Sequence, residues 1–347
     1  MNVRHIAKLA GVSASAVSLA LRDSPRISTA TKQRVCRLAK EAGYAPDAKI
    51  VDLMRHLRRP RAVRQGACFG VVSFYDSLRP WEKSQHLTRI HEGMTKRAHD
   101  LGFRLEPLWL RAPGMNYSRF RSILEARSIE GLLCFGSPDF EQEFPEELAK
   151  LAVVTLGLSI RTPLHRVTSH FYNDTVNALQ KVHQLGYRRP GLVLGAYEET
   201  RSAHTHSAAY LGWCEHVLGP GRALPVLRLT AVEKAPLLLW LEEQRPDVLI
   251  FVHLPEMLGA LRTVLRDKQL RIPKQLGVAV LSHRIEGTGF SGIQQNQQLM
   301  GAWAVELLAA RITNRDLGVP ANPRIEMVEG EWVQGETLRR SIAQPLT

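Results

Sequence analysis

Short apolar runs alternate with amphipathic segments from Ala67 onward, and this alternation limits the fold more than any other feature of the sequence. Continuous apolar strands separated by helices are typical of parallel sheets that helices cover on both faces. Eight strands between Ala67 and the C-terminus suit two lobes better than one sheet. The sequence therefore predicts a two-lobed α/β architecture. The eight runs are CFGVVSF (68–74), FRLEPLWL (103–110), EGLLCFG (130–136), LAVVTLGL (151–158), RPGLVLG (189–195), PVLRL (225–229), DVLIFV (247–252) and LGVAVL (276–281).

Helices are expected between these strands. A last strand is expected in EGEWVQGETL near the C-terminus, with Trp332 packed on the body, whereas Tyr197–Thr200 is expected to form a loop. Apolar residues recur at helical spacing over residues 90–101, 117–126, 175–185, 208–217, 255–266 and 299–312.

The positive charge is concentrated at the N-terminal end. Residues 1–65 hold 14 Lys and Arg residues against four Asp and Glu residues, which accounts for +10 of the formal net charge of +13. Such an asymmetry is typical of a basic module that binds a polyanion, joined to a nearly neutral body. The N-terminus lacks the apolar core of a secretory signal, no apolar run has the length of a membrane span, and the four cysteines are far apart. We therefore expect a cytoplasmic protein with reduced thiols.

The first 45 residues follow the pattern of a helix-turn-helix unit. Apolar residues recur at helical spacing over 3–10, Gly11 suits the positive φ of a tight turn, and Ser13 is placed to cap a second helix over 14–21. A third helix is expected after its cap, Ser28. This order of helices forms the DNA-binding helix-turn-helix, whose second helix enters the major groove.

The second helix begins with the small side chains of Ala14, Ser15 and Ala16. Short side chains let the backbone approach base edges. Serine hydroxyls can bond to bases or phosphates, and alanine can contact a thymine methyl group. The alternative is an ordinary amphipathic helix whose small face packs on another helix. The cap, the turn and the basic surroundings favour DNA binding.

At this point the chain resembles the lactose-repressor (LacI/GalR) family of transcription regulators. The resemblance rests on HIAKLAGVSASAVSLAL (5–21), ISTATKQRV (27–35) and AKEAGYAP (39–46), and it continues in IHEGMTKRAHDLGF (90–103) and QKVHQLGYRRPGLVLG (180–195). It implies an all-α helix-turn-helix domain followed by a periplasmic-binding-protein-like core of two Rossmann-like lobes. It also implies a homodimer on double-stranded operator DNA.

The resemblance implies three parts: the DNA-binding domain at 1–46, a hinge helix and basic linker at 47–66, and an effector-binding and dimerisation core at 67–347. Leu53 matches the leucine that opens the minor groove, with packing on the third helix as the alternative. Ile50 would pack on the partner's hinge. For the five arginines that follow, a solvated linker and extra phosphate contacts stay equally open. The two lobes are expected to be joined by crossings near 158–170, 284–296 and 313–325.

Leu19 is a departure, because the family commonly has arginine there and arginine reads guanine bidentately. We therefore expect an operator different from the usual one. The residues expected to contact DNA are Arg4, Ser13, Ala14, Ser15, Ala16, Ser18, Leu19, Arg22, Ser28, Thr31, Lys49, Ile50 and Leu53.

Ligands of open α/β sheets bind beyond the carboxyl ends of the strands. The resemblance implies that Arg201 holds the effector through sugar hydroxyls or a carboxylate, with a surface arginine as the alternative. Where many sugar-binding members carry Asn-Asp and Asp-Asp, this chain has His253-Leu254 and Ser282-His283. The effector is thus expected to be a small molecule, and two alternatives stay open: something other than a simple sugar, or a carbohydrate or related metabolite held by different contacts. The expected contacts are Phe74, Tyr75, Asp76, Ser137, Asp139, Arg201, His253 and His283.

These observations predict a sequence-specific transcription regulator, with repression favoured, whose operator affinity an effector controls. No catalytic motif follows a strand, and His204 and His206 alone cannot form a metal site, so no enzyme activity, metal or cofactor is expected. A solute-binding protein would need a secretory signal and no helix-turn-helix. A non-specific nucleic-acid binder would be indifferent to operator sequence. Whether the effector releases or loads the protein, and whether dimers pair into tetramers, stay open.

Overall fold

The computed structural model describes residues 3–21, 27–41, 67–148, 150–230, 234–252, 270–282 and 288–340, together with residues 261, 263, 264 and 266. The chain divides into two compact units, Met1–Gln65 and Gly66–Thr347. Each unit has its own apolar core and is considered by itself.

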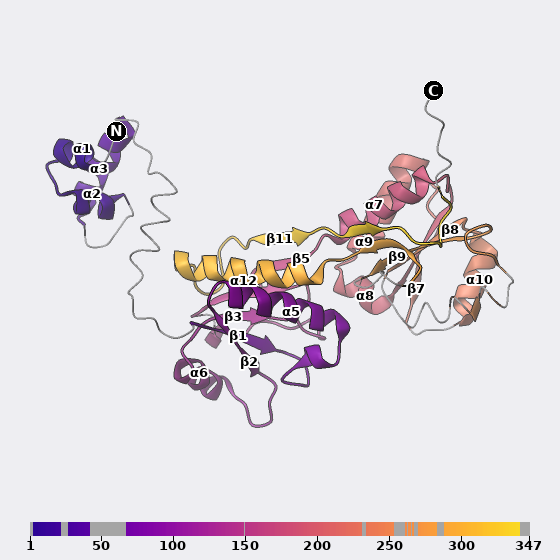
Figure 1. Ribbon diagram of the computed structural model, residues 1–347, viewed down its shortest axis with the longest axis horizontal. Helices are drawn as coiled ribbons and strands as arrows, with labels where there is room; N and C mark the ends of the chain where they lie inside the picture. Colours follow the sequence, from indigo (N-terminus) through magenta and orange to yellow (C-terminus); the bar gives the residue numbers. More distant parts are fainter. Residues whose placement is uncertain are drawn as a thin grey trace. The chain divides into compact units, whose positions relative to one another are not determined.

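The described part of the N-terminal unit contains three short helices (Figure 1). Each helix contributes one fully buried apolar side chain to a common core: Ile6, Val17 and Val35. The helices are α1 (Val3–Ala10), α2 (Ala14–Ala20) and α3 (Thr29–Glu41).

The first lobe of the second unit is a six-stranded sheet with the order β11-β5-β4-β3-β1-β2, in which all strand pairs are parallel. Val71 packs on the face covered by α5 and α12, which lie side by side in Figure 1, and Val72 packs on the face covered by α6. This alternation explains why the strands are apolar throughout. The elements are β1 (Cys68–Ser73), α5 (Gln85–Asp100), β2 (Arg104–Trp109), α6 (Tyr117–Ala126), β3 (Ile129–Cys134), β4 (Ala152–Leu156), β5 (His165–Ser169), α12 (Gln297–Asn314) and β11 (Ile325–Val328), with 3₁₀ turns at Pro80–Glu82 and Glu146–Leu148.

The second lobe repeats this plan with the order β12-β10-β9-β8-β6-β7. Its strands are parallel except β12, which runs antiparallel to β10. The two-lobed α/β fold predicted from the sequence is therefore confirmed. The elements are α7 (Phe171–Gln184), β6 (Pro190–Gly195), α8 (Ala196–Arg201), α9 (Thr205–Trp213) with a π-helical turn at Cys214–Leu218, β7 (Leu227–Leu229), α10 (Lys234–Gln244), β8 (Val248–Val252), β9 (Gly277–Ser282), β10 (Ser291–Gln294) and β12 (Glu331–Val333).

The chain crosses between the lobes at residue 170, at 295–296 and at 329–330. The first two positions fall at the C-terminal ends of their predicted ranges, because the short, partly polar strands β5 and β10 were not expected. The crossing predicted at 313–325 is wrong. There α12 ends on the first lobe, and β11 then adds a strand to the sheet of that same lobe before the chain returns.

Each of the eight predicted strands overlaps an observed strand, and Trp332 packs on the second lobe as expected. Residues Tyr197–Thr200 lie in α8, so their prediction as a loop is wrong. The helix expected at 255–266 falls mostly outside the described residues. No helix in the described part of the chain is long and apolar enough to cross a membrane.

Candidate functional site

The turn between α1 and α2 has the geometry that a helix-turn-helix needs. Gly11 adopts a positive φ of 63°, and the N–H of Val12 donates to the carbonyl of Ala7 at 3.1 Å. Ser13 then caps α2, because its Oγ accepts a hydrogen bond from the N–H of Ala16 at 3.1 Å. The cap fixes the start of α2, which is the end that a recognition helix presents to base edges.

The third helix is capped in the same way. The N–H of Thr31 donates to Ser28 Oγ at 3.3 Å, and the two hydroxyls lie 2.9 Å apart. Ser13 and Ser28 therefore have a structural role in their helices, and each hydroxyl keeps further bonding capacity.

A pocket of about 490 Å³ opens between the two lobes of the second unit. The first lobe contributes Tyr75 and Asp76 after β1 and His86 at the start of α5, whereas the second lobe contributes Tyr197 and Arg201 from α8. The walls thus combine two aromatic rings with charged and hydrogen-bonding groups, which is the composition of a site for a small polar ligand. Ser77, Pro80, Lys83, Ser84, Leu87, Pro138 and Glu198 complete the lining.

Two contacts bridge the lobes at this pocket. Arg201 Nη2 lies 2.8 Å from His86 Nε2, and the rings of Phe140 and Tyr197 lie 5.0 Å apart at 49°. Because a guanidinium donates hydrogen bonds and cannot accept them, His86 Nε2 accepts this bond and the ring carries its proton on Nδ1. Tyr75 lies beside them; burial raises the pKa of its phenol, and the nearby Arg201 opposes that rise.

A buried carboxylate holds α8 in place behind the pocket. Glu199 is 3% exposed, and its Oε1 accepts hydrogen bonds from Ser207 at 2.5 Å and from Arg228 at 3.0 Å, with His204 Nδ1 at 3.4 Å. Burial raises the pKa of Glu199, but the hydrogen bonds from Ser207, Arg228 and His204 outweigh it, so the pKa lies below its ordinary value. Glu199 is therefore charged at neutral pH and joins α8 to β7 and α9.

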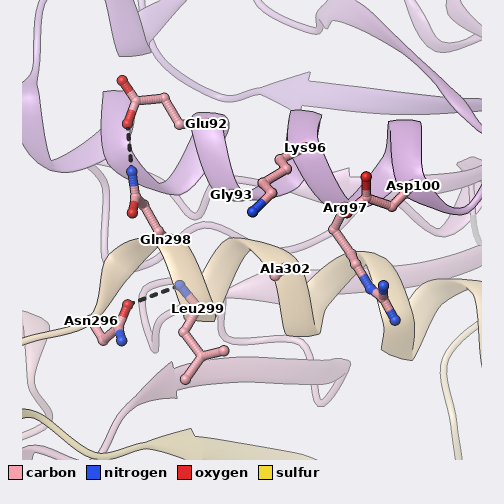
Figure 2. A pocket seen from close by; sticks show the side chains of 9 residues that line it. All are labelled: Glu92, Gly93, Lys96, Arg97, Asp100, Asn296, Gln298, Leu299 and Ala302. Atoms are coloured by element: carbon pink, nitrogen blue, oxygen red, sulfur yellow. Dashed lines mark hydrogen bonds between the residues drawn. The ribbon is translucent and has the colours of Figure 1, made fainter.

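A larger groove of about 650 Å³ runs between α5 and α12 on the first lobe (Figure 2). Its polar groups are largely satisfied locally: Gln298 donates to Glu92 at 2.9 Å, the N–H of Leu299 donates to Asn296, and Arg97 pairs with Glu306 at 2.6 Å. The inter-lobe pocket, although smaller, is therefore the better candidate for a ligand site. The described residues contain no group of three or more His, Cys, Asp or Glu that could hold a metal ion.

Comparison with known proteins identifies both units. The family described as bacterial regulatory proteins, lacI family, matches residues 2–47, and the periplasmic binding protein-like domain matches residues 179–338. The chain belongs to the lacI family. It is thus a DNA-binding transcription regulator with an effector-binding core, and the family is one of regulators and not of enzymes.

Relatives of this lacI-family chain match it along nearly its whole length. The HTH-type transcriptional repressor PurR of Haemophilus influenzae is 20% identical over 342 residues, covering 94% of this chain and 95% of the relative. The lac repressor dimer bound to operator and the anti-inducer ONPF is 17% identical, with a TM-score of 0.57, covering 97% of this chain and 98% of that one. The CelR–cellobiose complex is 18% identical, with a TM-score of 0.55, covering 97% and 99%. At these identities the two structures show a shared fold.

The structure gathers some of the residues predicted for the effector site of this lacI-family core and not others. Tyr75, Asp76 and Arg201 line the pocket. Phe74 is fully buried between the sheet and α6, so its prediction as an effector contact is wrong: consecutive residues at the end of β1 face opposite ways. His253 and His283 lie outside the described residues.

Ser137 and Asp139 have local roles and do not line the pocket. The N–H of Ser137 donates to Ser159 Oγ at 2.8 Å, and Ser137 Oγ accepts from the N–H of Asp139 at 3.1 Å. These bonds shape the loop after β3, from which Pro138 reaches the pocket. In this structure both residues support the pocket wall, and their role as effector contacts stays a prediction.

The structure describes fewer of the residues predicted to contact DNA. Ala16 and Leu19 are partly exposed on α2. Arg4 lies in α1, and Ala14, Ser15 and Ser18 lie in α2, whereas the side chains of these four are outside the description. Arg22, Lys49, Ile50 and Leu53 are outside the described residues.

Sequence reasoning missed His86, Lys83 and Tyr197 as lining residues. The signal for His86 was available, because Ser84 is a helix cap two residues earlier and so places His86 at the start of a helix that follows the first strand.

Proposed function

We propose that this lacI-family chain represses transcription as a homodimer on operator DNA, and that a small polar effector in the inter-lobe pocket controls its affinity for that DNA. The observation that carries the proposal is the capped helix-turn-helix in a chain that also holds a polar pocket between two lobes. Matched proteins support it: PurR is a repressor, the lac repressor binds operator as a dimer, and CelR binds cellobiose.

The DNA-binding half of the proposal rests on α2. Its first turn carries short side chains and a fixed cap, which suits close approach to base edges in the major groove. Two copies related by two-fold symmetry would read two half-sites about one helical turn apart, or roughly 34 Å. A palindromic operator is therefore expected, and binding to it should weaken as the salt concentration rises.

Ala16→Asp tests this role. A carboxylate placed on α2 would face the negative charge of the groove, so specific DNA binding should be lost while thermal unfolding of the core is unchanged. Ala112→Asp makes the same change of charge in a partly exposed loop of the core and should leave DNA binding unchanged. Retained affinity in Ala16→Asp would remove α2 from the groove.

The effector half of the proposal rests on Arg201 and its neighbours. Arg201 supplies planar donors, His86 and Tyr75 supply further hydrogen-bonding groups, and the rings of Tyr75 and Tyr197 supply flat apolar surface. This combination suits a ligand with hydroxyl or carboxylate groups on a compact ring or chain. Lobes bridged by such a ligand would change the spacing of the two DNA-binding units, which is coupling between two states of different affinity.

A panel of mono- and disaccharides and of small carboxylates separates the two ligand classes. A true effector should raise the melting temperature of the native chain and change its operator affinity. Arg201→Ala should lose both responses and keep operator binding, whereas Arg222→Ala, an exposed loop arginine, should respond like the native chain. An unchanged response in Arg201→Ala would move the effector site away from this pocket.

A further inference from the structure

One buried aspartate contacts all three crossings between the lobes, the first through its backbone N–H and the other two through its carboxyl group. Asp174 lies in the first turn of α7, four residues after the first crossing, and its own N–H donates to the carbonyl of His170. Its Oδ1 accepts a hydrogen bond from the N–H of Gly330, in the third crossing, at 2.9 Å. The side chain of Gln295, in the second crossing, also lies beside the carboxyl group. Asp174 therefore ties together the three segments on which any relative movement of the lobes depends.

We call Asp174 and the three crossings around it the joint between the lobes, and we call the arrangement in this structure the closed joint. The closed joint is closely packed. A Cβ atom at Gly330 would lie 3.1 Å from Asp174 Oδ1 and 3.0 Å from the carbonyl oxygen of Gln294. The second crossing is braced by a hydrogen bond from Gln297 Nε2 to Gln295 Oε1 at 3.2 Å. Asp174 is fully buried, and its Oδ2 has no hydrogen-bond partner among the described residues. A charge on this carboxyl group is thus poorly solvated unless the joint opens.

The charged and titratable groups around Asp174 do not compensate for its burial. Burial raises the pKa of Asp174 to about 7; the N–H of Gly330 opposes the rise, Glu329 adds to it by repulsion, and Gln295 opposes it. On α9, His206 lies 2.8 Å from the hydroxyl of Thr175, and burial lowers the pKa of His206 to about 4, with Glu199 opposing, so it stays neutral near pH 7.

The other elements packed against α7 add no charge at this point. The strands β9 and β10 carry no ionisable side chain. Besides the exposed Tyr172, His170, which caps α7 through its Nδ1, is the remaining titratable side chain at the same helix end. It therefore needs its own control.

We propose that Asp174 makes the joint between the lobes sensitive to protons: the neutral acid stabilises the closed joint, and ionisation opens it. The proton then acts as a ligand of the closed arrangement. Through the proposed function, on which this last step rests, acidification would favour any effector that binds the closed lobes.

The direction of the pH effect follows from linkage. In the closed joint the carboxyl group titrates near pH 7, whereas in an opened, hydrated joint it would titrate near its ordinary value of 3.8. Between these values the closed joint binds one more proton than the open joint. The opening equilibrium constant should therefore rise about tenfold per pH unit as pH increases from about 4, and level off above about 7.

Hydrogen exchange of the full chain, without DNA or effector, tests this directly. Exchange of peptides that cover 170–178, 293–298 and 328–333 is followed from pH 5 to pH 8 and corrected for intrinsic exchange rates. Native protein should show the tenfold rise per unit and the plateau, whereas Asp174→Asn, a neutral side chain of the same shape, should show a flat profile. His170→Asn keeps a capping side chain and removes the imidazole, so it should behave like the native protein.

Three results would overturn the proposal: a flat profile in the native protein, the same rise in Asp174→Asn, or a rise that His170→Asn abolishes. If Asp174→Asn does not fold, Asp174→Ser supplies a smaller neutral side chain. The native and His170→Asn profiles then remain decisive by themselves. Because the measurement involves no operator, a failure here is separate from a failure of the regulator function.

Discussion

The two lobes share one strand order but support their sides of the pocket in different ways. Behind the pocket wall of the first lobe lies apolar and aromatic packing: Trp81 stacks on His91 with ring centroids 4.1 Å apart and lies against Phe135. Behind α8 in the second lobe lies a polar cluster centred on the buried carboxylate of Glu199, bonded to Ser207 and Arg228.

This difference determines how each wall of the pocket responds to substitution. Apolar packing keeps a wall rigid but accepts substitutions of similar volume. A buried polar cluster specifies one arrangement when each partner is present and is costly when one is missing. We therefore expect the first lobe to act as a fixed platform and α8, with Arg201, to be the wall whose position depends on few residues.

The largest expected effect comes from the first lobe. The helices α5 and α12 meet at Gly93 and Gly301, where a Cβ atom would overlap the carbonyl oxygens of Gln298 and Ile90. Gly301→Val should therefore lower the free energy of unfolding by at least about 3 kcal/mol, because backbone and not a flexible side chain must move. Urea unfolding, with hydrogen exchange to locate the loss in the first lobe, measures it. A variant as stable as the native protein would contradict the close approach.

Removal of the buried carboxylate should have the next largest effect. Glu199→Ala removes the carboxylate that Ser207 and Arg228 share, leaves Ser207 only the carbonyl of His204 as an acceptor and frees α8. It should lower the free energy of unfolding by about 2–3 kcal/mol. The loss of stability is no larger than this because the half-exposed side chain of Arg228 can be solvated by water when Glu199 is removed. Exchange should increase in α8 and α9 and stay unchanged in α5. An equal increase in both lobes would remove the distinction between them.

The charge of Glu199 also predicts an acid-side pH dependence. Its pKa in the folded protein is lowered from an ordinary value of 4.5, so its stabilisation is present above that value and is lost as pH falls through the lower folded pKa. The stability difference between native protein and Glu199→Gln should therefore shrink below about pH 4.5. Thermal unfolding from pH 3 to pH 7 checks this, and a difference that grows in acid would reverse the assigned sign.

The aromatic contact between the lobes should contribute less to the free energy of unfolding. A double-mutant cycle with Phe140→Ala and Tyr197→Ala should give a coupling energy of about 0.5–1.5 kcal/mol, as expected for a tilted aromatic pair. Additive losses in chemical unfolding would show that the two walls do not hold each other through these rings.

The smallest expected effect is a gain in stability. Gly212 lies in α9, and a Cβ atom there would meet nothing within 4 Å. Gly212→Ala should raise the free energy of unfolding by about 0.5–1 kcal/mol through helix propensity alone. It is the matched control for Gly301→Val, since both add carbon to a helical glycine, and a loss of stability would place a contact at this surface.

The sequence predicted the long apolar strands and the capped helices, because burial on both faces and capping leave strong local patterns. It missed β5 (HRVTS) and β10 (SGIQ), in which His165 and Ser291 are hydrogen-bonded to partners far along the chain. One such bond joins His165 to Asp316 at 3.1 Å. The third crossing was misplaced for the same reason, since β11 is defined by its pairing with β5.

At the site, position after a strand identified Tyr75, Asp76 and Arg201 but did not show which way each neighbour faces. Phe74 illustrates the limit, because a shift of one residue at a strand end moves a side chain from the pocket to the core. Asp174 gave no local signal at all. An aspartate in the first turn of a helix is ordinary, and its burial arises from crossings more than 100 residues further along the chain.

The proposed regulator function depends on this chain reading operator DNA as a symmetric dimer. Selection of bound sequences from a random duplex pool, with the purified chain at near-physiological salt, tests it most directly. A symmetric dimer should recover a palindromic site whose enrichment Ala16→Asp abolishes. Recovery of no motif, with binding that disappears as salt rises and is equal in native protein and Ala16→Asp, would contradict it.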